Sequence, residues 1–411
     1  MARFRSAQGG DRLSCKSRRF LGYGRQSIDQ SDVDAVVGVL RSDFLTQGPA
    51  VDKFEAALAE RVGARHAVAV SSGTAALHIA CLVAGLRPGD RGLTAAVTFA
   101  ASANCLLYAG ADAGFVDIDG NGLAMSPTAL AHALEKEPGV NAIVSVHLAG
   151  LAHEAAAIRS LARKRFVIED ACHAIGGRYD CGAPIGCGAY SDMCVFSFHP
   201  VKTITTGEGG AVVTNDGDLA RRLRMLRNHG IEREASRFVG GDEREGGEVK
   251  PWLYEQQVLG FNYRMTDIQA ALGLSQLTRL EQFLERRRAI ARRYDEAFAR
   301  LPHLHLPQSL PEQRGRSGHH LYIVLIDFAA LRTTRTAFMG KLREHGIGTQ
   351  VHYIPVYRQP YYVKRYALDR GAFPESESYY ARCLSLPFYP GLTDEDVEHV
   401  IATITRLVTA G

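Results

Sequence analysis

Residues 66–86 read HAVAVSSGTAALHIACLVAGL, and this stretch decides the fold. An apolar run at 66–70 ends in four small residues, 71–74, and a mostly apolar helical stretch follows to about residue 86. A short buried strand that leads directly into a helix is the repeating unit of α/β proteins. The stretch therefore predicts one βα unit.

The same alternation continues along the chain. Six further apolar runs of strand length lie at 92–97, 115–118, 142–147, 166–170, 193–198 and 211–213. Helix-like stretches separate most of them. Short apolar strands that alternate with helices predict an α/β fold whose large domain has a mostly parallel, seven-stranded sheet covered on both faces.

Helices are also predicted on either side of this sheet. The one at 29–41 carries an apolar face formed by Val33, Val36, Val37 and Leu40. A second helix begins near Pro49, and from Thr266 a long helix extends towards residue 300, with apolar side chains every three or four positions. We expect this long helix to link the large domain to a smaller one.

The smaller, C-terminal domain is predicted to be α/β as well. It would contain strands at 321–326 and 347–353 and a helix near 332–345. Thr393, with Asp396 three residues later, predicts the cap of the last helix. The inward face of that helix would consist of Val397, Ile401, Ile404 and Val408.

The chain therefore divides into three predicted parts. Residues 1–19 form a basic, disordered tail, residues 20–265 the large domain, and residues 266–411 the linking helix with the small C-terminal domain. Residues 232–250 are charged and glycine-rich, which indicates a mobile surface loop within the large domain.

Composition and charge exclude several classes of protein. The 411 residues are 46% hydrophobic and 22% charged, which argues against disorder, a collagen-like repeat or a small disulfide scaffold. The net charge is +4, but residues 1–19 alone carry +5, which leaves the body at −1. A nearly neutral body argues against nucleic-acid binding. A mitochondrial-type presequence is a weaker interpretation of the tail, because the tail has no apolar helical stripe.

The sequence also gives no sign of a membrane segment or of secretion. The best apolar stretch, 75–86, is too short to span a bilayer and contains His78. The eight cysteines form no Cys-x-x-Cys pair, and the spacings within the group at 172–194 match no zinc module. We therefore expect a cytoplasmic protein with reduced thiols and no metal.

Three predicted strand ends carry residues that could bind a ligand or take part in a reaction. The first is 71–74. Small residues at the start of a helix leave free amide groups that bind an anion. Gly73 allows the backbone to approach closely, and Thr74 adds a hydroxyl. A helix cap without any ligand explains the same residues, and no Gly-Lys-Ser/Thr follows, which excludes a P-loop.

The second strand end carries Glu169 and Asp170. Acidic residues where a buried strand stops lie where α/β sheets place their ligand groups, and Asp170 could pair with a positively charged ring nitrogen. The alternative is that Asp170 caps the next helix. His173, taken alone, is more often a packed histidine than a functional one.

The third strand end, 196–210, contains Lys202. A lysine in a poorly solvated pocket loses affinity for its proton, and its free amine can attack an aldehyde. Ser197 and nearby threonine hydroxyls could hold a phosphate. A solvated surface lysine is the usual interpretation of any single lysine.

Taken together, the three strand ends match the requirements of pyridoxal 5′-phosphate. The phosphate would occupy the anion cradle, the pyridinium nitrogen would face Asp170, and the aldehyde would form a Schiff base with Lys202. Phe99 follows a strand and could stack on the ring.

The sequence resembles the DegT/DnrJ/StrS sugar aminotransferases, a family of fold-type I (aspartate aminotransferase-like) enzymes. The resemblance runs from about residue 20 to 408. Its most specific motifs are Leu-Thr-Gln-Gly at 45–48, Ser-Gly-Thr-Ala-Ala-Leu at 72–77, Glu-Asp-Ala-Cys-His-Ala at 169–174, Gly-Glu-Gly-Gly at 207–210, GFNYRMTDIQAALG at 260–273 and Val-His-Tyr-Ile-Pro at 351–355. The stretch 196–216 is most similar to the transaminases that make UDP-4-amino-4,6-dideoxy-N-acetyl-β-L-altrosamine in pseudaminic acid synthesis.

The resemblance implies roles for individual residues. Lys202 would be the Schiff-base lysine and Asp170 the partner of the ring nitrogen. The other cofactor contacts would be Gly73, Thr74, Phe99, His173 and Ser197, with Asn262 supplied by the neighbouring subunit of a homodimer with shared active sites. The sugar nucleotide would contact Gly73 and Ser197, and also Tyr23, Asp43, Phe44, Leu45, Thr46, Tyr263, Val351, His352, Tyr353 and Ile354. The tail and the 232–250 loop depart from the family pattern.

The function predicted on these grounds is transfer of an amino group, with L-glutamate as donor, to C4 of a UDP-linked 4-keto-6-deoxy-N-acetylhexosamine. One alternative is a transaminase for another keto-sugar, such as a 3-keto or D-configured one. A second is a non-catalytic regulator that binds the same cofactor. A third is a dinucleotide-binding Rossmann protein, which the missing Gly-x-Gly-x-x-Gly disfavours.

Overall fold

The computed structural model describes residues 19–152, 154–240, 244–245 and 248–409, so all of the predicted tail except Arg19 lies outside the described residues. Its main feature is a seven-stranded sheet with the order β1-β7-β6-β5-β4-β2-β3, and only β7 is antiparallel to its neighbours. The strands are β1 (His66–Val70), β2 (Arg91–Ala95), β3 (Asp112–Val116), β4 (Val140–Val146), β5 (Phe166–Asp170), β6 (Met193–Ser197) and β7 (Gly210–Thr214). The predicted α/β class and mostly parallel sheet are confirmed.

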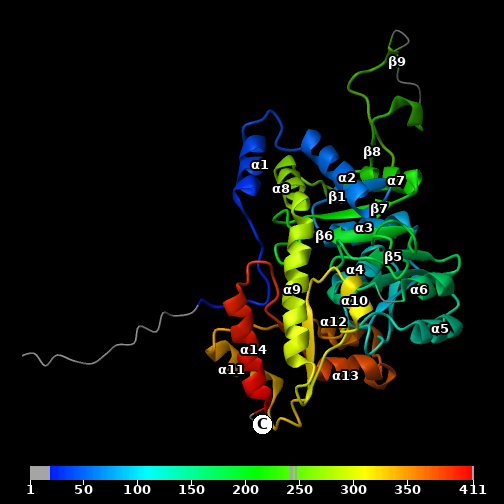
Figure 1. Cartoon of the computed structure of the whole chain (residues 1–411). Coiled ribbons are helices and arrows are strands. Elements are labelled where there is room, and N and C mark those ends of the chain that lie inside the picture. The colour runs from blue at the N-terminus through cyan, green and yellow to red at the C-terminus, as the bar shows by residue number, and fades with distance from the viewer. Residues whose placement is uncertain (1–18, 153, 241–243, 246–247, 410–411) are drawn as a thin grey trace, which may run out of the picture.

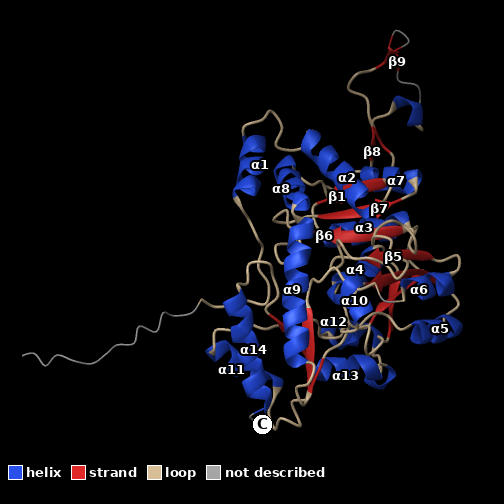
Figure 2. Ribbon diagram, in the orientation of Figure 1, coloured by secondary structure: helices blue, strands red, loops and turns tan. Residues whose placement is uncertain are grey.

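Helices cover both faces of this sheet, as Figure 2 shows. Alternate residues of β1 enter different cores: Val68 and Val70 pack with α3, α4 and α7, whereas Ala67 and Ala69 pack with α2, α8 and α9. The period-two alternation of a strand produces this division. The helices of this part are α1 (Gln30–Leu40), α2 (Pro49–Val62), α3 (Gly73–Val83), α4 (Ala101–Tyr108), α5 (Pro127–Lys136), α6 (Ala155–Ala162) and α7 (Gly217–Arg227).

The predicted long helix is two helices, α8 (Asp267–Thr278) and α9 (Leu280–Phe298). The break lies at Arg279, whose backbone leaves helical geometry with φ −102° and ψ 5°. Its guanidinium lies against Asp29 and Asp32 of the neighbouring α1 segment. The prediction of one uninterrupted helix was therefore wrong. The predicted domain boundary at 265/266 remains a proposal. Helix α8 packs with α1 and α2 beside the large sheet, and this packing favours a boundary within α9.

A three-stranded antiparallel sheet forms the second part of the molecule, with the order β12-β13-β14. Its core also draws on α9, α11 and α14 (Figure 1). The elements here are β12 (Leu304–His305), α10 (Pro311–Arg316), β13 (Tyr322–Ile326), α11 (Arg335–Glu344), α12 (Pro360–Tyr366), α13 (Pro374–Arg382), β14 (Cys383–Leu386) and α14 (Asp394–Thr409). No helix in the described ranges is long and apolar enough to cross a membrane.

The prediction of a strand at 347–353 was wrong, whereas the prediction of the last helix is confirmed. Residues 347–353 form isolated bridges only, from Ile347 to Leu21 and from Gln350 to Ser385. The pairing positions beside β13 are taken by β12 and β14, which the sequence pattern did not reveal. Thr393 and Asp396 cap α14 reciprocally, as predicted.

Short strands lie within and beside the predicted loop at 232–250. Within it are β9 (Arg244–Glu245) and β10 (Glu248–Val249), and at its two sides are β8 (Ile231–Glu232) and β11 (Glu255–Gln256). Strand β8 pairs with β11, and β9 pairs with β10. Figure 1 shows the ribbon around β9 projecting away from the body. Residues 241–243 and 246–247 lie outside the described ranges, and the mobility of the segment remains a prediction.

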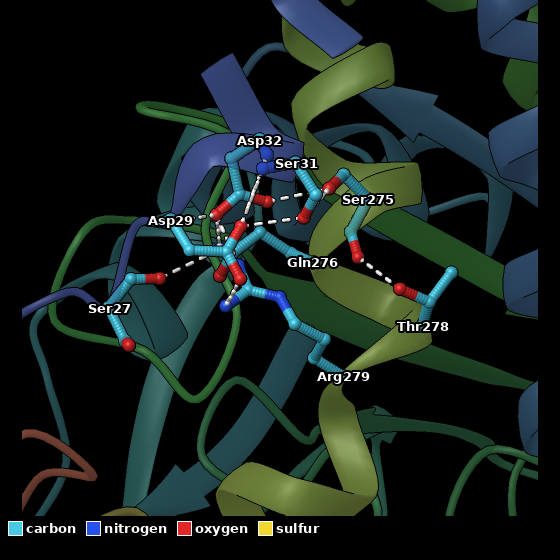
Figure 3. A network of polar contacts seen from close by, with 8 residues as sticks. All are labelled: Ser27, Asp29, Ser31, Asp32, Ser275, Gln276, Thr278 and Arg279. Carbon is cyan, nitrogen blue, oxygen red and sulfur yellow. Dashed lines mark hydrogen bonds and ion pairs between the residues drawn. The ribbon is translucent and has the colours of Figure 1, made fainter. Parts of the chain in front are cut away.

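A polar network fastens α1 to α8, and Figure 3 shows its side chains. Asp29 is the N-cap of α1, and Asp32 completes the capping box three residues later. The Asp32 carboxylate is 1% exposed and accepts hydrogen bonds from Ser275 and Gln276 at 2.7 Å each. Arg279 pairs with the same carboxylate and, at 2.6 Å, with Asp29. A carboxylate buried this completely is tolerated because every partner is present.

We expect Asp32→Ala to lower the free energy of unfolding by about 3 kcal/mol, because it leaves Arg279 and Gln276 without their buried acceptor. Chemical denaturation followed by circular dichroism measures the loss. The control is Asp34→Ala, an exposed acid on the same helix, for which a change within about 0.5 kcal/mol is expected. Equal losses in the two variants would contradict the role given to Asp32.

Candidate active site

The register of the large sheet brings three strand ends to one edge. Gly210, the first residue of β7, pairs with Val70 at the end of β1 and with Ser197 at the end of β6. Asp170 ends the neighbouring β5 and pairs with Val195 of β6. Ligand groups of α/β sheets lie at this carboxyl edge.

A cavity of about 800 Å³ opens at this edge. Its lining comes from the ends of β1, β5 and β6, from the loop after β2, and from the segments at 23, 320 and 350–359. The lining residues that the sequence analysis had selected are Tyr23, Gly73, Thr74, Phe99, Asp170, His173, Ser197, Lys202, Val351, His352, Tyr353 and Ile354.

The start of α3 forms the anion cradle. Ser72 is the N-cap, and its hydroxyl accepts from the amide of Ala75 at 3.1 Å. Within the described ranges, no protein acceptor is bonded to the amides of Gly73 and Thr74, so these two remain available to a ligand. A Cβ on Gly73 would lie 2.9 Å from Cβ of Ser197. Glycine is therefore required where β6 approaches the cradle. Ser72 caps the helix while the amides of Gly73 and Thr74 stay free, so the helix-cap and anion-site interpretations of this segment are compatible.

Asp170 faces the cavity from the end of β5 and is 7% exposed. Its Oδ2 accepts a hydrogen bond from Ser102 at 2.6 Å, and Ser102 lies 2.7 Å from the hydroxyl of Thr98. Its Oδ1 accepts from the amide of Cys172 at 3.2 Å. These bonds fix the orientation of the carboxylate at the cavity. No helix begins after Asp170 in the described chain, so the alternative that it caps a helix is wrong.

The preceding acid, Glu169, points to the other side of the strand and has a structural role. Its carboxylate accepts from Tyr179 and Ser191 at 2.6 Å each and lies 3.0 Å from Nε2 of His147. Burial alone would raise the pKa of Glu169, but these contacts outweigh it and hold the pKa below the ordinary value. Adjacent residues of one strand therefore supply one structural and one cavity-facing carboxylate.

Lys202 closes a turn after β6, in which its amide donates to the carbonyl of His199 at 2.8 Å. Pro200 lies within this turn, where its fixed φ is favourable. Burial lowers the pKa of the Lys202 ammonium and outweighs the opposing electrostatic effects of Cys172 and Asp170. A lowered pKa increases the fraction of free amine, which is the nucleophilic form.

Histidine and tyrosine side chains form the wall opposite the cradle. The amide of Ala149 donates to Nδ1 of His173 at 3.3 Å, which leaves the Nε2 proton to donate to the Tyr353 hydroxyl, also at 3.3 Å. Burial lowers the pKa of His173 far below its ordinary value, and the nearby Lys202 adds to this. Burial likewise lowers the pKa of His352 to about 4. Both rings are therefore neutral at pH 7. Phe99 is 58% exposed and lies 5.9 Å from the ring of Tyr353.

Six residues assigned from the resemblance do not line this cavity in the same chain. Asp43, Phe44, Leu45 and Thr46 are exposed in the segment between α1 and α2. Asn262 is exposed and bridges to Asn228, whereas the hydroxyl of Tyr263 lies 3.2 Å from Nδ1 of His78. Their predicted contacts with cofactor and sugar therefore remain proposals that need a second subunit.

Sequence reasoning missed four residues of the site. Thr98 and Ser102 form the hydrogen-bonded pair that holds Asp170. Cys172 lies between Asp170 and Gly73. His320, which precedes β13 of the three-stranded sheet, also lines the cavity. The only signal for Ser102 was its place just after Phe99 at the start of a helix. His320 directly precedes a predicted strand, but nothing in the local sequence relates it to residues 150 positions earlier.

The residues present fit pyridoxal 5′-phosphate. Free amides at a helix start, a hydrogen-bonded carboxylate and a buried amine line one cavity large enough for the cofactor and part of a substrate. Within the described residues, no group of three or more His, Cys, Asp or Glu is placed to hold a metal ion.

Comparison with known proteins identifies the same class. The sequence profile of the DegT/DnrJ/EryC1/StrS aminotransferase family matches residues 26–405. The spore coat polysaccharide biosynthesis protein SpsC of Bacillus subtilis is 38% identical over 397 residues, which are 96% of this chain and 98% of that protein.

Solved structures agree with this match. Helicobacter pylori PseC, described as an aminotransferase involved in the biosynthesis of pseudoaminic acid, is 30% identical with a TM-score of 0.85, covering 96% of this chain and 100% of PseC. The PLP-form of the putative sugar aminotransferase Spr1654 from Streptococcus pneumoniae is 28% identical with a TM-score of 0.84, covering 95% of this chain and 99% of Spr1654. The cofactor of this protein is accordingly pyridoxal 5′-phosphate.

Ser102→Ala removes the hydroxyl that holds Asp170. We expect the dissociation constant for pyridoxal 5′-phosphate to rise about 3- to 10-fold, the effect of one lost hydrogen bond to a charged group. Fluorescence titration of the cofactor-free protein measures it. Ser145→Ala, at a buried serine of β4 away from the cavity, is the control and should leave the affinity unchanged. An unaltered affinity in Ser102→Ala would show that Asp170 is positioned without this bond.

Proposed function

The chain belongs to the DegT/DnrJ/EryC1/StrS aminotransferase family, and on this premise we propose which substrate it aminates. It is a pyridoxal-phosphate-dependent sugar aminotransferase. The proposed reaction transfers the amino group of L-glutamate to C4 of a UDP-linked 4-keto-6-deoxy-N-acetylhexosamine, as a step of pseudaminic acid synthesis. Similarity to PseC and the stretch 196–216 support this choice of sugar.

The observation that carries the reaction is the shared cavity of Lys202, Asp170 and the cradle. Bound pyridoxal phosphate supplies an aldehyde that exchanges amino groups and a ring that accepts electrons when a Cα–H bond breaks. Asp170, fixed by Ser102, would keep a proton on the ring nitrogen. The Lys202 amine, with its lowered pKa, would take the proton from the substrate Cα and deliver it to the cofactor carbon that carries the amino group. The Gly73 and Thr74 amides would bind the phosphate.

Two alternatives remain as outcomes of the test. A transaminase for a 3-keto or D-configured sugar would have the same cofactor pocket, because that pocket does not contact the stereocentres. A non-catalytic regulator has no need for a buried amine and a fixed carboxylate in one cavity.

We also propose that the enzyme is a homodimer whose subunits complete each other's sites. The six assigned residues outside the cavity are exposed or turned away from it. Two of the six, Phe44 (53% exposed) and Leu45 (48%), are large exposed apolar side chains, and Val33 (44%) and Leu40 (55%) of the preceding α1 are also exposed. Exposed apolar side chains in one segment favour an interface, and a second copy of the chain would cover them and bring the missing contacts.

We further propose a cytoplasmic location. The seven cysteines in the described ranges are free thiols, the state that a reducing compartment maintains. Fractionation of cells that produce the protein at native level tests this placement.

Lys202→Ala should abolish amination and remove the absorbance band of the lysine-linked cofactor, because no other described side chain of the cavity is a lysine. The assay incubates the purified enzyme with glutamate and a panel of UDP- and dTDP-linked keto-sugars, and identifies the products by mass spectrometry and NMR. Lys164→Ala, at an exposed lysine, is the control and should retain both properties. Amination by Lys202→Ala would overturn the assignment, and a product other than a 4-amino UDP-sugar would select one of the alternatives.

Shared sites predict complementation between two inactive variants. In a mixed dimer of Lys202→Ala and Asn262→Ala, one site keeps both Lys202 and the partner's Asn262. Refolding the two variants together at a 1:1 ratio should therefore restore up to about a quarter of wild-type activity. Each variant refolded alone is the control. No recovery, with mixed dimers demonstrated by mass spectrometry, would show that Asn262 does not act across an interface.

A further inference from the structure

The cavity lacks a side chain for the carboxylates of an amino-acid donor. Of the described residues that line it, Lys202 is the sole lysine or arginine, and the cofactor occupies that amine. A donor such as glutamate carries two carboxylates, and a buried carboxylate requires hydrogen-bond donors or a positive charge. Within one chain, another group in the wall would have to supply this contact.

His320 is the group in the wall without a partner. It precedes β13, is 4% exposed and lines the cavity. Its ring lies 4.3 Å from the ring of His173. The ring makes no hydrogen bond to the described part of the chain, and its Nδ1 is buried there without a partner. Buried polar side chains are normally bonded, so an unbonded one at a cavity indicates a ligand contact.

Arg287 adds a positive charge directly behind His320. It lies on α9, is 1% exposed, and donates from Nη1 to the carbonyl oxygens of His319 (3.2 Å), His320 (3.2 Å) and Phe388 (2.9 Å). Among the described residues it forms no ion pair with an acid, and its buried Nε has no partner. Burial lowers the pKa of Arg287 to about 10, so it is charged at pH 7. An uncompensated buried cation attracts an anion nearby.

We infer that His320, with Arg287 behind it, forms the subsite for a carboxylate of the amino-acid donor. The inference rests on the proposed function only in taking an amino acid as the donor. The His320 ring would donate one N–H to the carboxylate, and the carboxylate would balance the charge of Arg287. His320 thus binds the donor, whereas Arg287 is a positioning residue that acts through the 319–320 backbone.

The protonation state of His320 agrees with this role. Burial lowers the pKa of His320 far below its ordinary value, and the nearby Lys202 and Arg287 act in the same direction. A neutral imidazole carries one N–H and one acceptor nitrogen. The subsite therefore offers a hydrogen bond from His320 and the more distant charge of Arg287, instead of the bidentate hydrogen bonds of an arginine in direct contact.

The test measures binding of glutarate, a dicarboxylate without an amino group, to the enzyme loaded with pyridoxal phosphate. His320→Leu, which has no donor, should raise the dissociation constant of glutarate about 10- to 100-fold. His320→Gln, which keeps an N–H donor, should raise it less. The matched control is His319→Gln, because that buried ring contacts the carbonyl of Arg314 at 2.8 Å and does not line the cavity. Binding of UDP and the cofactor absorbance should be unchanged in all three variants.

Equal glutarate affinity in wild-type and His320→Leu protein would overturn the inference, as would an equal loss in His319→Gln. If His320→Leu fails to fold, His320→Asn, whose shorter amide cannot extend as far, takes its place with the same expected loss. Single-turnover conversion of the cofactor by glutamate, followed by absorbance, should show the same order of variants. Neither measurement uses a keto-sugar. Failure to aminate any keto-sugar would therefore contradict the proposed function and leave the glutarate and glutamate results unaffected.

Discussion

The close contact of Gly210 with the peptide joining Ser72 and Gly73 is the constraint on which the site depends. A Cβ on Gly210 would lie 2.5 Å from the carbonyl carbon of Ser72 and 2.6 Å from the nitrogen of Gly73. Because Gly210 pairs with both β1 and β6, this contact sets the distance between the anion cradle and the segment that carries Lys202. The groups that line the cavity are thus placed by sheet register and backbone packing, in a frame that is already rigid.

Local sequence patterns predicted the large sheet well because its strands are buried on both faces and read as continuous apolar runs. They failed where contacts between distant parts of the chain determine whether a segment is a strand or where a helix ends. Residues 347–353 look like a strand, but β12 and β14 occupy both sides of β13. Arg279, at the helix break, pairs with two acids 247 and 250 positions earlier in the chain. Lys202 and Asp170 were found because each follows a strand, whereas Ser102 and His320 gain their roles only through contacts that no local pattern encodes.

The cavity and its surroundings bury polar groups of very different cost. Asp170 at the cavity and Glu169 on the other side of the strand accept hydrogen bonds from hydroxyl and amide donors. Arg287, which does not line the cavity, is buried as a cation and, among the described residues, is hydrogen-bonded only to carbonyl oxygens. The cavity histidines His173, His320 and His352 remain neutral at pH 7. The lining therefore offers several neutral hydrogen-bonding groups to a polar, multiply hydroxylated substrate.

The thiol of Cys172 has a consequence for chemical selectivity. It lies between Asp170 and the cradle, where burial and the charge of Asp170 both raise its pKa well above the ordinary value. The thiolate is the reactive form of cysteine, so at neutral pH this sulfur is a poor competitor for an aldehyde and resists oxidants and alkylating agents. The protein can therefore keep a sulfur atom beside an electrophile, filling space as a small apolar group, while the neighbouring amine alone reacts.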